Sequence, residues 1–169
     1  IVVVSSTRVY GENHGAVIND DSPTIPCDEQ GNLLLKMEEL WQQAYPNECV
    51  IVRPTGIYGT SSARMVKLAE VTKTYSNIHW SNRIHIYDLA NFLAHLLHVE
   101  HPEKSYICTN NQPQPLHEMI LKIQRDLNLP ELVLQSQNET GKKIFADNMV
   151  KSGYKLKHDS CLLDYRKLL

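Results

Sequence analysis

The stretch IVVVSSTRVYG, residues 1–11, decides how the rest of the chain is interpreted. Residues 1–4 are β-branched with no polar lead-in, which is the pattern of a strand buried on both faces. A polar turn follows at once, so functional side chains are expected at the carboxyl end of this strand. Because a buried strand needs neighbours and the sequence does not begin with methionine, we expect earlier strands of the sheet to precede residue 1.

Short apolar strands and amphipathic helices alternate along the rest of the chain. Strands are predicted at residues 50–52, 84–86, 105–108 and 132–134, and helices at residues 29–44, 63–73, 89–97, 117–127 and 147–151. Asp28 and Asp88 are expected to cap helices, Pro54 and the glycines after it to stop a strand, and residues 135–143 to form a polar loop. This alternation predicts an α/β fold with a parallel sheet, whose carboxyl-edge loops are the first places to look for chemistry.

Composition narrows the class of partner. Among 169 residues, 17 Lys and Arg face 19 Asp and Glu, for a net charge of -2; with no basic run, neither nucleic acid nor an anionic membrane surface is expected as a partner. No apolar run approaches the ~20 residues that span a bilayer. Four scattered cysteines without a C-x-x-C pair argue against a zinc ribbon and fit a reducing compartment, so we expect a cytoplasmic protein. The histidines spaced by three at positions 95, 98 and 101 flank an apolar stripe, and no metal is expected there.

Three motifs occur in one order: Ser5-Ser6-x-x-Val9-Tyr10-Gly11, then Arg53-Pro54-x-Gly56-x-Tyr58-Gly59, then Arg83-Ile84-His85-x-x-Asp88-Leu89-Ala90. Together they resemble the extended short-chain dehydrogenase/reductases, the NAD(P)-dependent sugar-nucleotide epimerases and dehydratases. Lys142-Lys143-x-x-x-Asp147 and Gly153-Tyr154 extend the resemblance. It implies that residues 1–169 form the C-terminal half of an NAD(P)-binding Rossmann domain, a partial doubly wound parallel sheet with interleaved segments of a small substrate-capping region. The Gly-rich turn that holds a dinucleotide pyrophosphate does not occur in this sequence, so the resemblance places it in an upstream half.

The resemblance also assigns roles at the reaction centre. In this family a Ser or Thr acts with the Tyr and Lys of a Y-x-x-x-K motif in hydride transfer. Ser6 matches the serine that orients the substrate oxygen, and Lys36 matches the lysine that holds the cofactor ribose. Asn32 stands where the tyrosine belongs, and an amide cannot act as a general acid or base. Tyr10, Tyr58 and a desolvated Lys36 are the candidates for rescue, although we favour the interpretation of Tyr10 as a packed residue with a hydrogen-bonded hydroxyl.

Two more groups of residues are candidates. By resemblance, Pro54, Thr55 and Gly56 run past the nicotinamide and the substrate. Arg83 and His85 are candidate substrate contacts. By resemblance, sugar-nucleotide enzymes carry a pyrophosphate-binding arginine where Ser81 stands here. Because side chains alternate along a strand, Arg83 would lie on the same face as Ser81 and His85, so it is the candidate contact for an anion. His85 is also interpreted as a buried, hydrogen-bonded residue, and Arg53 is expected to pair with a carboxylate.

Three functions therefore stay open. The first is an NAD(P)-dependent epimerase/dehydratase-like oxidoreductase acting on a small molecule such as a nucleotide sugar, with activity reduced or lost through Asn32. The alternative is a non-catalytic dinucleotide-binding or regulatory module, and the third is an interaction protein without cofactor. NAD or NADP is the implied cofactor, and the resemblance implies a homodimer through residues 33–44.

Overall fold

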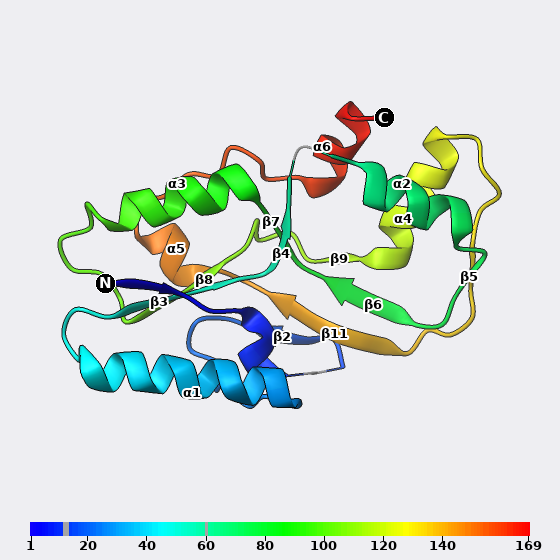
Figure 1. The fold of residues 1–169 in the computed structure, drawn as a ribbon. Coiled ribbons are helices and arrows are strands. Elements are labelled where there is room, and N and C mark those ends of the chain that lie inside the picture. Colours follow the sequence, from blue (N-terminus) through cyan, green and yellow to red (C-terminus); the bar gives the residue numbers. More distant parts are fainter. Residues whose placement is uncertain (12–13, 60) are drawn as a thin grey trace.

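The computed structural model describes residues 1–11, 14–59 and 61–169 (Figure 1). In chain order the elements are β1 Val2–Val4, the 3-10 helix η1 Thr7–Tyr10, β2 Ala16–Ile18, α1 Glu29–Ala44, β3 Val50–Pro54, β4 Gly56–Tyr58, α2 Ala63–Val71, β5 Thr74–Tyr75, β6 Ile78–Ser81, β7 Arg83–His85, α3 Ile86–Leu96, β8 Ser105–Cys108, β9 Gln114–Pro115, α4 Leu116–Asp126, β10 Val133–Leu134, β11 Glu139–Ile144, α5 Asp147–Lys151 and α6 Cys161–Lys167. None of the helices in these described ranges is both long and apolar enough to cross a membrane.

A three-stranded parallel sheet in the order β1-β3-β8 lies between helices and is called here the main sheet. Its central strand β3 is buried along its whole length, and its side chains alternate between two helical layers. Ile51 packs in a cluster with Met37 of α1, whereas Val52 lies in the cluster that contains Phe92 of α3. Figure 1 shows α1 on one side of this sheet and α3 with α5 on the other. The expected α/β architecture with a parallel sheet is confirmed.

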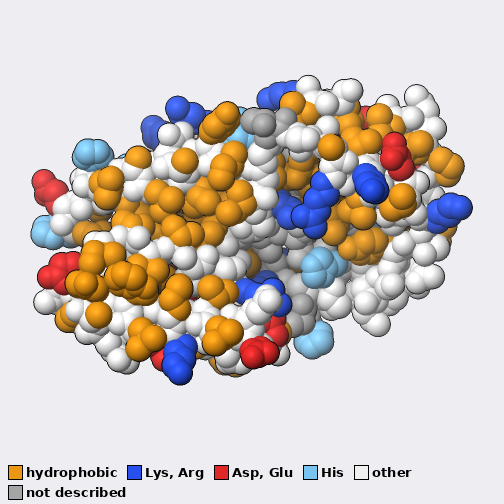
Figure 2. Space-filling model, viewed as in Figure 1, with side chains coloured by type: hydrophobic (Ala, Val, Ile, Leu, Met, Phe, Trp, Pro, Cys, Tyr) orange, Lys and Arg blue, Asp and Glu red, His pale blue; other side chains and the backbone are white. Residues whose placement is uncertain are grey.

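The first strand is only partly buried within residues 1–169. β1 is an end strand of its sheet, and the side chain of Val4 is 47% exposed while Val3 is buried. Burial of this strand was expected together with earlier strands of the sheet, so that expectation stays a prediction. β3 is the strand of this sheet whose two faces are covered, by α1 on one side and α3 on the other. Figure 2 shows hydrophobic side chains gathered over the part of this face where Figure 1 places β1 and α1. Leu33 and Leu40 of α1 are among the exposed ones.

A smaller region of short strands packs beside the main sheet. It holds a four-stranded sheet in the order β2-β11-β6-β9 and the parallel pairs β4-β7 and β5-β10, with α2, α4 and α6 around a second apolar cluster that contains Met65, Ile120 and Tyr165. One prediction fails here, because the polar segment 135–143 contributes β11. Pro54 ends β3 as predicted, and β4, which was not predicted, begins at Gly56 and belongs to another sheet. Strands β2, β5, β6 and β9 and helix α6 were not predicted.

The caps of the two longest sheet-covering helices differ in how well they were predicted. Asp28 caps α1 as expected, because its carboxylate accepts the Gly31 N–H at 2.7 Å. Asp88 does not cap α3. His85 is the cap residue, and its Nδ1 accepts the Tyr87 N–H at 3.2 Å. The buried Asp88 carboxylate instead accepts from the Tyr154 hydroxyl at 2.9 Å and from backbone N–H groups of residues 157 and 158, so it ties the segment after α5 to α3.

Candidate active site

The carboxyl ends of β1 and β3 open onto a cavity of about 270 Å³, called here the central cavity. Its walls come from the loops after β1 and β3, from β6 and β7, and from β11, so that five separate segments converge on it. The lining residues are Thr7, Thr55, Gly56, His79, Trp80, Ser81, Asn82, Arg83, Leu116, Gly141, Lys142 and Ile144. The position agrees with the rule that ligands of parallel sheets bind outside the strands' carboxyl ends.

The loop after β1 is fixed by its own side chains. The Ser6 hydroxyl accepts the Arg8 N–H at 3.2 Å and thereby caps η1, which is the short-range bond that serine favours at a strand end. The next residue, Thr7, donates its hydroxyl hydrogen to the Pro54 carbonyl at 3.3 Å. Ser6 is half-buried at this edge, and Thr7, which the sequence analysis did not single out, is the one that lines the cavity.

The loop after β3 brings backbone rather than side chains to the site. Thr55 bonds to the Cys108 carbonyl through its N–H at 3.0 Å and through its hydroxyl at 3.3 Å. The Gly56 N–H donates to the Asn82 carbonyl at 3.1 Å. A Cβ at Gly56 would come within 2.5 Å of Arg83 Nη1, so glycine is needed here for the arginine to lie against the backbone.

Tyr10 and Arg53 form a buried network behind these loops. The Arg53 guanidinium bonds to both Glu38 oxygens, with Nη2 to Oε2 at 2.6 Å, and Nη1 donates to the Tyr10 hydroxyl at 2.8 Å. Burial raises the pKa of Tyr10, and the nearby Arg53 charge opposes that rise. The expected carboxylate partner of Arg53 is therefore Glu38, and Tyr10 is packed with a bonded hydroxyl.

Asn32 and Lys36 lie one turn apart on α1, and both are exposed. Asn32 Nδ2 donates to the Asp28 carbonyl at 2.9 Å, a bond local to the first turn of the helix. No described residue forms a hydrogen bond or ion pair with the Lys36 ammonium. At the position where a tyrosine was expected, the chain therefore presents an amide, which cannot act as a general acid or base.

Arg83 stands between two cavities. It lines the central cavity and also a second one of about 200 Å³ that contains Ser61, Arg64 and Tyr165 among its lining residues, called here the arginine cavity. The Arg83 Nε atom is buried without a hydrogen-bond partner. No described residue pairs with the side chain of Arg83 or Arg64. Figure 2 shows Lys and Arg side chains beside the hollow in the middle of this face.

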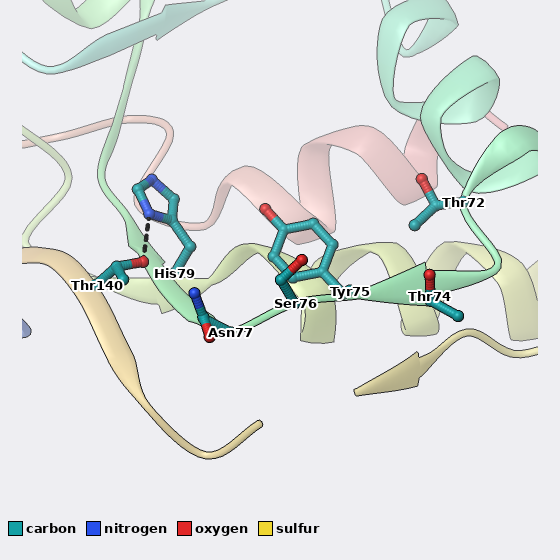
Figure 3. A pocket seen from close by; sticks show the side chains of 7 residues that line it. All are labelled: Thr72, Thr74, Tyr75, Ser76, Asn77, His79 and Thr140. Carbon is teal, nitrogen blue, oxygen red and sulfur yellow. Dashed lines mark hydrogen bonds between the residues drawn. The ribbon is translucent and has the colours of Figure 1, made fainter. Parts of the chain in front are cut away.

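A third cavity, of about 440 Å³, lies next to the central cavity and shares the lining residue His79 with it. Figure 3 shows its hydroxyl and amide side chains: Thr72, Thr74, Tyr75, Ser76, Asn77, His79 and Thr140. His79 Nδ1 and the Thr140 hydroxyl lie 3.0 Å apart, which joins β6 to β11 across the opening. Among the described residues, His79 is the only acidic or basic side chain that lines this hydroxyl-lined cavity.

Solved structures resemble the whole chain, whereas no family model and no curated protein matches it. A provisionally assigned NAD-dependent epimerase/dehydratase from Methylobacillus flagellatus is 31% identical and covers 99% of this chain and 62% of its own, with a TM-score of 0.84. Its fold is shared here. The chain has the fold of the NAD-dependent epimerase/dehydratases. A dTDP-glucose 4,6-dehydratase from Bacillus anthracis in complex with NAD is 16% identical, with a TM-score of 0.79 over 99% of this chain and 60% of that one.

A human epimerase family protein with NADPH gives a TM-score of 0.76 at 18% identity, over 99% of this chain and 64% of that one. The chain thus spans somewhat less than two thirds of the length of these epimerase/dehydratase structures. At this level of identity the two more distant structures share the fold alone.

Within the epimerase/dehydratase fold, the predicted site residues separate into two groups. Thr55, Gly56 and Arg83 line the central cavity, while Asn32 and Lys36 lie on the exposed side of α1 and Tyr10 is enclosed behind the loops. His85 lies further along β7, beside Tyr58. The sequence analysis missed Arg64, His79 and the threonines of the hydroxyl-lined cavity, because they come from segments with no motif of their own.

Proposed function

We propose that this chain supplies the substrate-binding part of an NAD(P)-dependent oxidoreductase of the epimerase/dehydratase kind, and that its substrate is a nucleotide sugar. The observation that carries the proposal is the Arg83 guanidinium, which lies between two cavities without a counter-ion among the described residues. Leaving a buried donor unpaired costs about 1–3 kcal/mol, and more for a charged group. An anion in the cavity that Arg83 lines would offset that cost.

Charge and shape support a phosphate-containing substrate. Arg64 and Arg83 line one cavity together, and Lys142, whose ammonium donates to the Gly11 carbonyl, joins Arg83 in the other, while no acidic residue is among the described side chains that line these two cavities. Arginine favours phosphate because its planar donors match two oxygens at once. The hydroxyl-lined cavity, which shares His79 with the central cavity, has groups that suit a polar ring system. A nucleotide sugar combines these features, because it has an anionic phosphate bonded to a polar sugar ring.

The cofactor would be NAD or NADP, which supplies hydride exchange at a hydroxyl or carbonyl carbon when it is bound. This chain would supply part of the site for it. The Lys36 ammonium, with which no described residue pairs, would bond to a ribose hydroxyl, the Pro54–Gly56 segment would run past the nicotinamide, and Ser6 at the end of β1 would orient the substrate oxygen. The phosphate-holding Gly-rich turn is not part of this sequence, so binding calls for the remainder of such a domain.

Asn32 favours the second candidate, a non-catalytic dinucleotide-binding or regulatory module. Its side chain is exposed and bonded to the backbone of its own helix, and Tyr10 is held by Arg53 behind the loops. Neither residue offers an exchangeable proton in the central cavity. If the protein is active, the proton donor is a group other than these two.

Binding and turnover are separated by two measurements on the full-length protein. Calorimetry with UDP- and dTDP-sugars is compared for the native chain, for Arg83→Met and for Arg125→Met, a matched control on an exposed arginine of α4 that is paired with Glu131. We expect Arg83→Met to weaken binding about tenfold or more, from the loss of a charged hydrogen bond, and the control to leave it unchanged. Equal binding by all three proteins would refute the substrate proposal.

Absorbance of the nicotinamide band with NAD(H) and NADP(H) then tests turnover. A change on adding nucleotide sugar favours the oxidoreductase, and cofactor binding without any change favours the regulatory module. We further propose a cytoplasmic homodimer that pairs through the exposed leucines of α1, which sedimentation of the native chain and of a Leu33→Glu variant would test.

A further inference from the structure

Two histidine rings are stacked at the far end of β7 from the central cavity. The ring centroids of His85 and His158 lie 3.7 Å apart with 13° between the ring planes. Tyr58 packs edge-on against His85 at 4.9 Å and donates its hydroxyl hydrogen to Asp164 at 2.7 Å. Asp164 Oδ2 also lies 3.1 Å from His158 Nδ1. The pair therefore joins β4, β7 and α6.

The hydrogen bonds determine which nitrogen of each ring carries the proton. His85 Nδ1 accepts the Tyr87 N–H, so the neutral ring carries its proton on Nε2. His158 Nδ1 faces the Asp164 carboxylate and must donate to it, which leaves Nε2 as the atom that can gain a second proton. Neither Nε2 atom has a partner among the described residues. The two rings thus present one donor and one proton acceptor.

Both rings line a cavity of about 210 Å³, called here the histidine cavity, with Gly59, Tyr87, Asp164, Lys167 and Leu168. His85 is only 3% exposed, so the surface it retains faces the cavity. An unpartnered N–H on a buried ring is a feature that an acceptor oxygen would satisfy. Tyr87 and Leu168 offer apolar surface on the remaining walls.

We propose that the histidine cavity binds a small carboxylate with an apolar body and that binding brings a proton onto His158. The carboxylate oxygens would accept from Nε2–H of His85 and from the protonated Nε2 of His158. Asp164 stabilises the resulting imidazolium through Nδ1–H. With His158 and Lys167 positive and Asp164 negative, the cavity then has one net positive charge, which matches a monoanion.

Only one of the two rings can take up the proton. The lone pair of His85 Nδ1 is used by the Tyr87 N–H, and two charged rings at this spacing would repel each other. The titratable and charged groups that face His158 are Tyr58, His85, Tyr87, Asp88, Asp164 and Lys167. Asp88 faces it through the backbone, since it accepts the His158 N–H at 2.8 Å, and Lys167 Nζ lies 3.7 Å from Asp164.

This site is independent of the nucleotide-sugar proposal, because the ligand needs neither Arg83 nor a cofactor. Butyrate serves as the probe, since it stays ionised from about pH 6 to about pH 8. Binding to the full chain is measured by calorimetry and by the imidazole NMR signals of both histidines. We expect affinity to fall by up to tenfold per pH unit where free His158 is neutral, as one linked proton requires.

Three variants carry the test. His158→Asn keeps a donor toward Asp164 but removes Nε2, so the pH dependence should disappear. His85→Asn keeps an acceptor for the Tyr87 N–H and should weaken binding about tenfold through the lost donor. His98→Asn, an exposed position just after α3, should bind as the native chain does. The proposal is wrong if butyrate leaves both imidazole signals unmoved, if sulfate binds as tightly as butyrate, or if His158→Asn keeps the pH dependence.

Discussion

The buried pair of Glu38 and Arg53 offers the sharpest test of how the loops of the candidate site are held. Glu38 is 1% exposed and Arg53 is 8% exposed, and three nitrogen–oxygen distances of 2.6–3.2 Å join them. Glu38→Gln keeps the shape of the side chain but removes its charge. The Arg53 guanidinium then stays buried without a counter-ion, which costs about 3–5 kcal/mol. Against a typical total of about 5–15 kcal/mol, this is a large loss.

The assay is urea unfolding of the full chain at neutral pH, with Glu38→Gln, Arg53→Met and the double variant. Removing both charges eliminates the unpaired ion, so the double variant should be more stable than the sum of the two single losses predicts. Glu131→Gln is the matched control, because it breaks an exposed pair with the same partner types. We expect no change in its urea midpoint.

Two results would refute this reasoning. The first is a Glu38→Gln midpoint no lower than that of the control, which would mean that water reaches the guanidinium. The second is strict additivity in the double variant, which would mean that the two side chains do not interact energetically.

Three further variants test other parts of the structure. Burial and the neighbouring His158 lower the pKa of His85, so the unfolded chain takes up a proton first as the pH falls below about 6.5, and the native state should lose stability below that pH. His85→Asn should make the urea midpoint depend less on pH, and an unaltered pH dependence would contradict this. Asp88→Ala removes the acceptor of residues 154–158 and should cost about 1–3 kcal/mol, with faster amide exchange in that segment; unchanged exchange would contradict the tie. Gly141 has φ +71°, and a Cβ there would lie 2.6 Å from a carbonyl oxygen of β6. Gly141→Ala should therefore lower the free energy of unfolding by about 1–2 kcal/mol or more. An unchanged urea midpoint would argue against the close approach.

The predictable part of the fold is the part with strong local patterns. Strand β3, strand β8 and helix α1 with its Asp28 cap were all predicted, because each combines a clear apolar period with a terminal signal. The parallel pairing of β1 with β3 followed from the helix between them. These features depend on residues that are close in sequence.

What failed depends on distant partners. The segment Glu139–Ile144 is polar, and it becomes β11 only because β2 and β6 lie on either side of it. Asp88 has the right residue type for a cap, but the chain 66 residues later offers the Tyr154 hydroxyl and two N–H groups. No local period carries that information.

The candidate site is divided in the same way. The loops after β1 and β3 were predicted from strand ends, and Arg83 from its alternation with His85, although the roles of these residues stay predictions. Arg64 and His79 reach the cavities from two separate elements, α2 and β6. A single sequence gives no signal of that convergence.

The outer side of β1 has a consequence for anyone who handles the isolated chain. On the edge of β1 that faces away from β3, no described strand pairs with the backbone, and the side chain of Val4 at the end of β1 is exposed. The unpaired N–H and C=O groups of such an edge strand can hydrogen-bond to an extended segment of another molecule. Preparations of residues 1–169 alone should therefore aggregate as the protein concentration rises, and a soluble extended peptide added in excess should slow the aggregation.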